Sequence, residues 1–146
     1  MKRTSKQLKW ILIAAVLVAA CSKKTQEKKE DSSFNISGLI QIDPKLLKGA
    51  RDSDTIFLMA KPAAGGPPVA VQKFTGRKYP YPYVLTEKDL MMPQESLQSP
   101  LNLSVRVDKD GDPMTKAPGD LVGTYEKNPV SLHSENIVIQ VNEALK

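Results

Sequence analysis

The sequence is poor in the residues that most often carry chemistry. Its 146 residues include one cysteine, one histidine and one tryptophan, so an intrachain disulfide is excluded and a blue-copper centre lacks its two His and one Cys ligands. A nucleophile needs a base within reach, yet His133 is flanked by Ser131 and Ser134 without a Gly-x-Ser-x-Gly turn. No glycine-rich phosphate loop is present either. We therefore predict no enzymatic activity, metal, cofactor or small-molecule substrate.

Long hydrophobic runs are also missing. The longest run, residues 10–20, has about 11 residues, whereas a membrane-spanning helix needs roughly 20. It follows a start that is rich in lysine and arginine, and a basic start before a short apolar run is typical of a secretion signal. We therefore predict a signal peptide over residues 1–20 rather than a transmembrane anchor.

The lone Cys21 has a use that requires no second cysteine. Small residues at 18–20 precede it, as a signal-peptide cleavage site requires, and its thiol can carry a diacylglyceryl thioether. Two or more acyl chains anchor a protein stably to a bilayer. Residues 22–33 have no apolar side chain, so we predict that residues 21–33 form a lipidated, disordered tether. An ordinary cleaved signal with a free thiol is the alternative.

The formal net charge of +5 belongs mostly to the predicted signal peptide. Without residues 1–20 the chain keeps 17 basic and 16 acidic side chains, so it offers no basic footprint for nucleic acid. Ser22 stands where an inner-membrane retention signal would usually place Asp. By the sorting rule of enteric bacteria, this favours the outer membrane over the inner, with the mature chain on the periplasmic side of the envelope.

Residues 34–146 have the length of one domain and the hydrophobic pattern of β-strands, because apolar and polar residues alternate in short segments. Glycine and proline lie between these segments and supply turns. We predict an all-β domain: an antiparallel β-sandwich of about seven strands, immunoglobulin-like or cupredoxin-like. The expected strands are residues 35–42, 55–60, 69–74, 81–85, 101–107, 121–125 and 137–141, with single helical turns at 44–48 and 87–91.

Asp108, Asp110 and Asp112 alternate in the stretch after one expected strand. An EF-hand calcium loop needs glycine at its sixth position and an acid at its twelfth. Here Gly111 is fourth and Gly119 is twelfth. We predict a polar hairpin turn, with a weak surface calcium site as the alternative.

Tyr79, Tyr81 and Tyr83 alternate with two prolines. An extended chain would place the three rings on one side, while the prolines confine the segment to a sheet edge or a polyproline-like path. An aromatic row beside an open edge can receive a peptide. The alternative, that one or two of these rings cap the core, carries equal weight.

Five motifs, taken together, resemble the C-terminal periplasmic domain of cytochrome c-type biogenesis proteins of the CcmH/CycH kind. They occur in the same order and with similar spacing, and the resemblance spans about residues 36–141. The motifs are DTIFLMA at residues 54–60, GPPVAV at 66–71, DLMMP at 89–93, VRVD at 105–108 and PGDLVG at 118–123.

The resemblance implies a binding role. In that family the domain follows transmembrane helices and a helical repeat region, and the whole protein delivers unfolded apocytochrome c to the haem-attachment machinery. The implied partner is therefore apocytochrome c or that machinery. Residues 1–35 hold no repeat array here, and no Cys-x-x-Cys-His is present to attach haem.

The shared motifs divide into structural and surface residues. Adjacent Met91 and Met92 offer an adaptable apolar surface to a partner, although one of them could plug the end of the sandwich. The residues to which we assign structural roles in turns and connections are Gly66, Pro67, Pro68, Pro93, Gly119, Asp120 and Gly123.

These features together predict a membrane-tethered, non-enzymatic accessory lipoprotein. We expect it to bind a protein partner in cytochrome c maturation. The alternative is a structural lipoprotein of the cell envelope with no cytochrome role.

Overall fold

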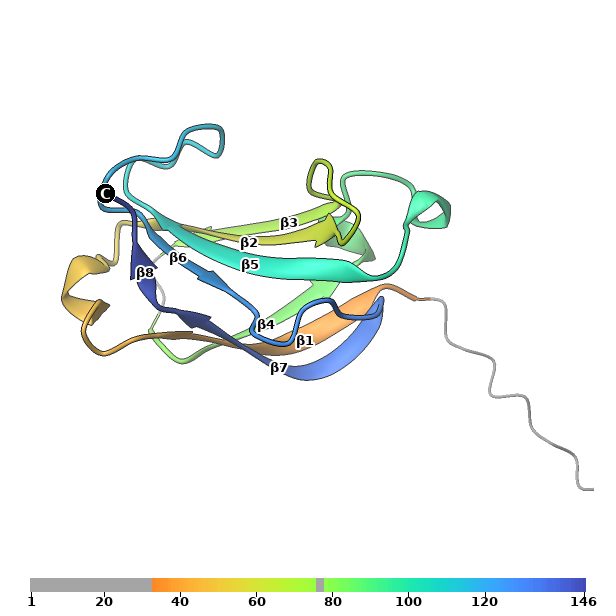
Figure 1. Ribbon diagram of the computed structural model, residues 1–146, viewed down its shortest axis with the longest axis horizontal. Coiled ribbons are helices and arrows are strands. Elements are labelled where there is room, and N and C mark those ends of the chain that lie inside the picture. The colour runs from red at the N-terminus through yellow and green to blue at the C-terminus, as the bar shows by residue number, and fades with distance from the viewer. Residues whose placement is uncertain (1–32, 76–77) are drawn as a thin grey trace, which may run out of the picture.

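Two β-sheets packed face to face form the domain (Figure 1). The computed structural model describes residues 33–75 and 78–146. The predicted signal peptide, Cys21 and nearly all of the predicted tether lie outside the described residues. The strands are β1 (Asn35–Ile42), β2 (Thr55–Pro62), β3 (Ala70–Thr75), β4 (Tyr81–Thr86), β5 (Leu101–Asp108), β6 (Leu121–Thr124), β7 (His133–Val141) and β8 (Glu143–Ala144).

The smaller sheet has the strand order β4-β1-β7, and the larger has the order β3-β2-β5-β6-β8. All neighbours in the larger sheet run antiparallel, so the predicted all-β sandwich is confirmed, and each expected strand is present. The pairing of β1 with β7 is parallel, which differs from a wholly antiparallel arrangement. A parallel neighbour needs a long connection, and here the chain between β1 and β7 builds β4 and every strand of the larger sheet except β8.

The core follows from the alternation along the strands. On β5 the side chains of Leu101, Leu103, Val105 and Val107 are all at most 1% exposed and pack in one cluster with the inward side chains of the smaller sheet. Burying such a side chain contributes roughly 1.5–3 kcal/mol relative to exposure. The sandwich is therefore held together by residues at every second position of its central strands.

The two sheets approach each other closely where β6 passes β7. A Cβ added at Gly123 of β6 would lie 2.2 Å from the Gln140 carbonyl oxygen of β7. After β7 the chain passes into the larger sheet, where β8 pairs with β6. Only glycine leaves room for this approach of two backbones.

Helical structure in the described part is limited to single 3₁₀ turns: η1 (Leu47–Gly49), η2 (Glu87–Asp89) and η3 (Gln94–Ser96). The first two overlap the helical turns expected from the sequence. Thr86 and Asp89 form a capping box at η2, in which the Thr86 N–H donates to Asp89 Oδ2 at 2.8 Å. No helix among the described residues is long and apolar enough to cross a membrane.

Candidate functional site

A groove of about 950 Å³ lies on the face of the larger sheet that is turned away from β1 and β7. The loop between β2 and β3 and the loop between β5 and β6 rise on this side of the sheet (Figure 1). We call it the outer-face groove. The residues that line it are Phe57, Met59, Lys61, Pro67, Pro68, Val71, Lys73, Met91, Ser104, Val105, Arg106, Pro113, Met114, Lys116, Val122, Gly123, Thr124, Glu143 and Leu145.

Strand register builds the floor of the groove. Phe57 of β2 pairs with Lys73 of β3 and with Arg106 of β5, which pairs in turn with Val122 of β6, opposite Glu143 of β8. These five residues form one row across the larger sheet, with one member from each strand. A second row runs parallel to it and consists of Val71, Met59, Ser104 and Thr124.

Phe57 is the most unusual member of the floor. It is 3% exposed although it points away from the core cluster, which does not include it. The Arg106 guanidinium carbon lies 5.3 Å from the centre of its ring, and Lys73 Nζ lies 5.5 Å from it. The electron-rich face of an aromatic ring attracts cations that lie above it. The outer face of this sheet therefore has an apolar floor beneath positive charge.

Arg106 also joins the floor to the wall of the groove. Its Nη2 lies 3.0 Å from Asp108 Oδ2 and donates to the Asp112 carbonyl oxygen at 2.8 Å. Both Arg106 and Asp108 are buried. Burial raises the pKa of the Asp108 carboxyl, whereas the hydrogen bond from the Gly111 N–H and the charge of Arg106 act to lower it. The guanidinium is thus fixed in place and is already committed to partners within the domain.

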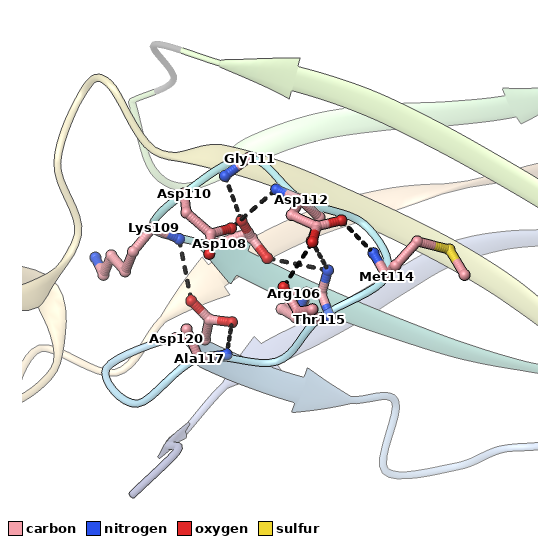
Figure 2. Close-up of polar contacts among 10 residues, drawn as sticks. All are labelled: Arg106, Asp108, Lys109, Asp110, Gly111, Asp112, Met114, Thr115, Ala117 and Asp120. Carbon is pink, nitrogen blue, oxygen red and sulfur yellow. Dashed lines mark hydrogen bonds and ion pairs between the residues drawn. The ribbon is translucent and has the colours of Figure 1, made fainter.

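The long wall is the β5–β6 loop, which aspartate side chains hold in shape (Figure 2). Asp112 accepts the Met114 N–H at 2.8 Å and the Thr115 hydroxyl at 2.8 Å. The bond from Met114 leads the interactions that hold the pKa of Asp112 below its ordinary value. Asp108 accepts the Gly111 N–H at 2.6 Å. The predicted polar turn is present, and these carboxylates bind the loop's own backbone.

Asp120 closes the same loop at its base. It is fully buried, and its two carboxylate oxygens accept the backbone N–H groups of Lys109 and Ala117, each at 3.0 Å (Figure 2). Its backbone carbonyl accepts the N–H of Leu145, next to the groove. This geometry is a structural role of the kind that the sequence predicts for Asp120, and Asp120 ties both ends of the loop to the C-terminal segment.

A further ion pair fixes the start of this loop to the connection between β1 and β2. Lys109 Nζ pairs with buried Asp54 and donates to the Gly49 carbonyl oxygen. Arg51 also pairs with Asp54, with its Nε 3.4 Å from Oδ1. The loop that walls the outer-face groove is therefore pre-ordered by bonds on both of its sides.

The charge of the outer-face groove differs from that of the domain. Residues 34–146 contain 13 basic and 13 acidic side chains. The groove has Lys61, Lys73, Lys116 and Arg106 but one acid, Glu143. None of the ion pairs found among the described residues includes its three lysines. The groove is a locally positive, largely apolar surface.

The three tyrosines predicted as a partner-binding row lie elsewhere. Tyr83 is 3% exposed, belongs to the core cluster and donates its hydroxyl to the Ile137 carbonyl oxygen at 3.4 Å. Tyr79 and Tyr81 pack against that cluster, and Tyr81 stacks on Phe74 with ring centres 4.6 Å apart. β4 does form a sheet edge. The interpretation of Tyr83 as a partner contact is nevertheless wrong, because its ring fills the core.

Burial also sets the ionisation of two of these rings. The pKa of Tyr79 is raised to about 12, first by burial and second by the negative charge of Asp54. Burial likewise raises the pKa of Tyr83. The Tyr79 hydroxyl is buried and has no hydrogen-bond partner among the described residues. Both groups are therefore neutral structural phenols under ordinary conditions.

The two methionines predicted as partner contacts, Met91 and Met92, lie in different environments. Met91 is 67% exposed and lines the outer-face groove, whereas Met92 packs against the core cluster.

The residues predicted to have structural roles lie in turns and connections. Pro67 and Pro68 form part of the groove wall, and Gly66 before them has a φ of 118° that favours glycine. Pro93 begins the turn at η3, and Gly119 has a φ of 93°. His133 is exposed at the start of β7.

Several groove residues were not identified from the sequence, notably Phe57, Met59, Met114 and the three lysines. A usable signal existed, because residues 56–59 are apolar without interruption. Such a run places apolar side chains on both faces of its strand, as happens when both faces are covered. The second face of β2 is the floor of the outer-face groove.

The family comparison agrees with this architecture. The model of the cytochrome c-type biogenesis protein H Ig-like domain matches residues 36–142. A protein of Aquifex aeolicus (strain VF5), described as uncharacterized, is 24% identical over 152 residues, which cover 95% of this chain and 97% of that protein. An alternative pilotin from the type II secretion system of Vibrio cholerae has a TM-score of 0.48 and 13% identity, over 77% of this chain and 96% of the pilotin chain.

The family match covers well over half of the chain and nearly all of its described residues. It starts on β1 and ends just after β7, so it takes in both sheets and the outer-face groove almost completely. The chain therefore belongs to the family of the cytochrome c-type biogenesis protein H Ig-like domain.

Proposed function

We propose that the protein is a lipid-anchored factor on the periplasmic side of the cell envelope that binds a protein partner during cytochrome c maturation. It performs no chemical step of its own. The observation that carries the proposal is the family match over residues 36–142, which relates nearly the whole sandwich to cytochrome c biogenesis.

The outer-face groove supports a binding role. Its floor includes the apolar side chains of Phe57, Met59 and Val71. Met91 and Met114 also line it, and methionines adapt to varied partner surfaces. The bonds of Asp112 and Asp120 order the wall before any partner arrives. A pre-ordered surface loses less conformational entropy on binding.

The anchor in this proposal is acylated Cys21 at the end of the signal peptide, with outer membrane favoured over inner. Cys21→Ser removes the acceptor of the lipid, and we expect the variant to leave the membrane fraction after a carbonate wash while the wild type stays. Blotting of the separated fractions measures this. A variant that remains in the membrane pellet would mean that residues 10–20 are a true anchor.

The role in cytochrome c maturation is tested by deleting the gene and staining membranes and periplasm for covalently bound haem. We expect c-type cytochromes to fall in the deletion strain and to return when the wild-type gene is restored. Unchanged haem staining would remove the maturation role and would favour the alternative, a structural lipoprotein of the envelope.

A further inference from the structure

The outer-face groove has features that specify the chemistry of its partner. Lys61, Lys73 and Lys116 are exposed and come from the end of β2, from β3 and from the β5–β6 loop. Arg106 is buried and is committed to Asp108 and to the Asp112 carbonyl. The three lysines are therefore the charges that remain available to a ligand.

The apolar part of the groove lies between these cations. Met59 and Val71 are paired across β2 and β3, while Met91 and Met114 stand on the rim, 67% and 87% exposed. Exposed apolar side chains that gather on one surface mark an interaction site. A ligand for this groove must present both apolar and anionic groups.

The spacing of the cations indicates a chain segment rather than a single anionic group. Lys73 pairs with Phe57, and Lys61 lies four positions further along β2, which is about 13 Å at the rise of a strand. Lys116 comes from a third element, the β5–β6 loop that walls the groove. Carboxylates distributed along a polypeptide can meet such cations together, whereas one lipid headgroup presents its charge at one point.

We propose that the outer-face groove binds an apolar segment of a partner protein that carries Asp or Glu side chains. The apolar side chains cover Met59, Val71 and the rim methionines, and the carboxylates pair with Lys61, Lys73 and Lys116. This inference rests on the proposed function, since it names the chemistry of the partner. Charge pairing of this kind mainly sets specificity and the rate of encounter.

Binding of labelled decapeptides to the lipidated protein, held in phosphatidylcholine vesicles, tests the proposal by fluorescence anisotropy. The probes are one peptide of alternating Leu and Glu and one of alternating Leu and Lys, each corrected for protein-free vesicles. We expect the Leu–Glu peptide to bind at least about tenfold more tightly and its affinity to fall as salt is added. Equal affinity for the two peptides would overturn the proposal.

Charge reversal locates the site. Lys61→Glu combined with Lys116→Glu should abolish the preference for Leu–Glu. The matched control, Lys45→Glu combined with Lys127→Glu, changes the same net charge at exposed positions outside the groove and should keep the preference. A preference that survives in the groove variant, with an unchanged melting temperature, would contradict this assignment.

A lipid surface is the competing occupant. Vesicles of phosphatidylglycerol added to the assay should not displace the Leu–Glu peptide, and displacement that disappears with the groove variant would overturn the proposal in favour of a membrane surface. These assays are independent of haem staining in the deletion strain. The peptide preference can therefore fail while the maturation role stands, and the reverse also holds.

Discussion

Asp120 shows how much of the groove depends on one side chain. Its carboxylate takes two backbone N–H groups, eleven and three residues before it in the chain, and no solvent reaches it. Hydrogen bonds to a charged group contribute more than neutral ones, and an unsatisfied buried donor costs roughly 1–3 kcal/mol. The wall of the groove is therefore sensitive to the loss of this carboxylate.

Asp120→Ala is expected to lower the free energy of unfolding by about 2–4 kcal/mol, because two partly buried N–H groups lose a charged acceptor. Urea denaturation followed by circular dichroism measures the change. Asp52→Ala is the control, since it removes the same charge from an exposed loop position and should cost less than about 0.5 kcal/mol. Equal costs for the two variants would show that the bonds to Lys109 and Ala117 do not stabilise the loop.

Tyr79 gives the domain a dependence on high pH. Its folded pKa of about 12 lies above the ordinary value of 10.0, so the folded state holds its proton where the unfolded state loses it. Stability from this group is complete below about pH 10 and declines as the pH rises toward 12. Burial also raises the pKa of Tyr83, so this group affects stability in the same direction.

Tyr79→Phe should therefore lose less stability than the wild type between about pH 8 and pH 11, because phenylalanine has no proton to release. At pH 8 the variant should be at least as stable, since the Tyr79 hydroxyl is buried without a hydrogen-bond partner among the described residues. Urea unfolding at both pH values gives the comparison. An identical decline in both proteins would place Tyr79 in solvent.

At the scale of elements, the close approach of β6 and β7 holds the two sheets in their relative position. Gly123 lies at this crossing, and the chain then places β8 beside β6. A side chain at Gly123 would push β6 away from β7 and disturb the row that carries Val122 into the groove.

Gly123→Ala is expected to destabilise the domain by about 1–3 kcal/mol or more, because its Cβ would lie 2.2 Å from a backbone oxygen that cannot move freely. Gly49→Ala is the matched control: the nearest atom to its added Cβ is a Leu121 methyl carbon at 3.9 Å. Thermal unfolding compares them. Similar melting temperatures for the two variants would mean that the strands separate at little cost.

The elements most accessible to sequence reasoning were the strands with one buried face. Alternation on residues 101–107 predicts β5 directly, because side chains on a strand point to opposite faces in turn. The parallel pairing of β1 with β7 was not predictable in this way, since alternation is local and carries no information about which distant strand will be the neighbour.

The site was harder to predict than the fold. The Tyr-Pro segment was correctly expected at an edge, yet its rings turn inward, because residues 81 and 83 share the inward phase of β4. Met92, expected at the surface together with Met91, packs on the core. The groove depends on cross-strand rows and on bonds such as Lys109 to Asp120, which exist only after folding.

The domain as a whole has no net formal charge, but its charged side chains are unevenly distributed over the surface. Its basic and acidic side chains are equal in number over residues 34–146, while the outer-face groove has several cations and one acid. With a lipid anchor at Cys21, the partner would be met at the membrane surface. We propose that the protein acts through this one face of the sandwich.

We propose that the outer-face groove acts in cytochrome c maturation, and haem staining of a complemented deletion strain is the most direct test. The strain receives the wild type, the groove variant (Lys61→Glu with Lys116→Glu) or the control variant (Lys45→Glu with Lys127→Glu), each at equal protein level. We predict normal c-type cytochromes with the wild type and the control, and a clear loss with the groove variant. Normal haem staining with the groove variant would contradict the account.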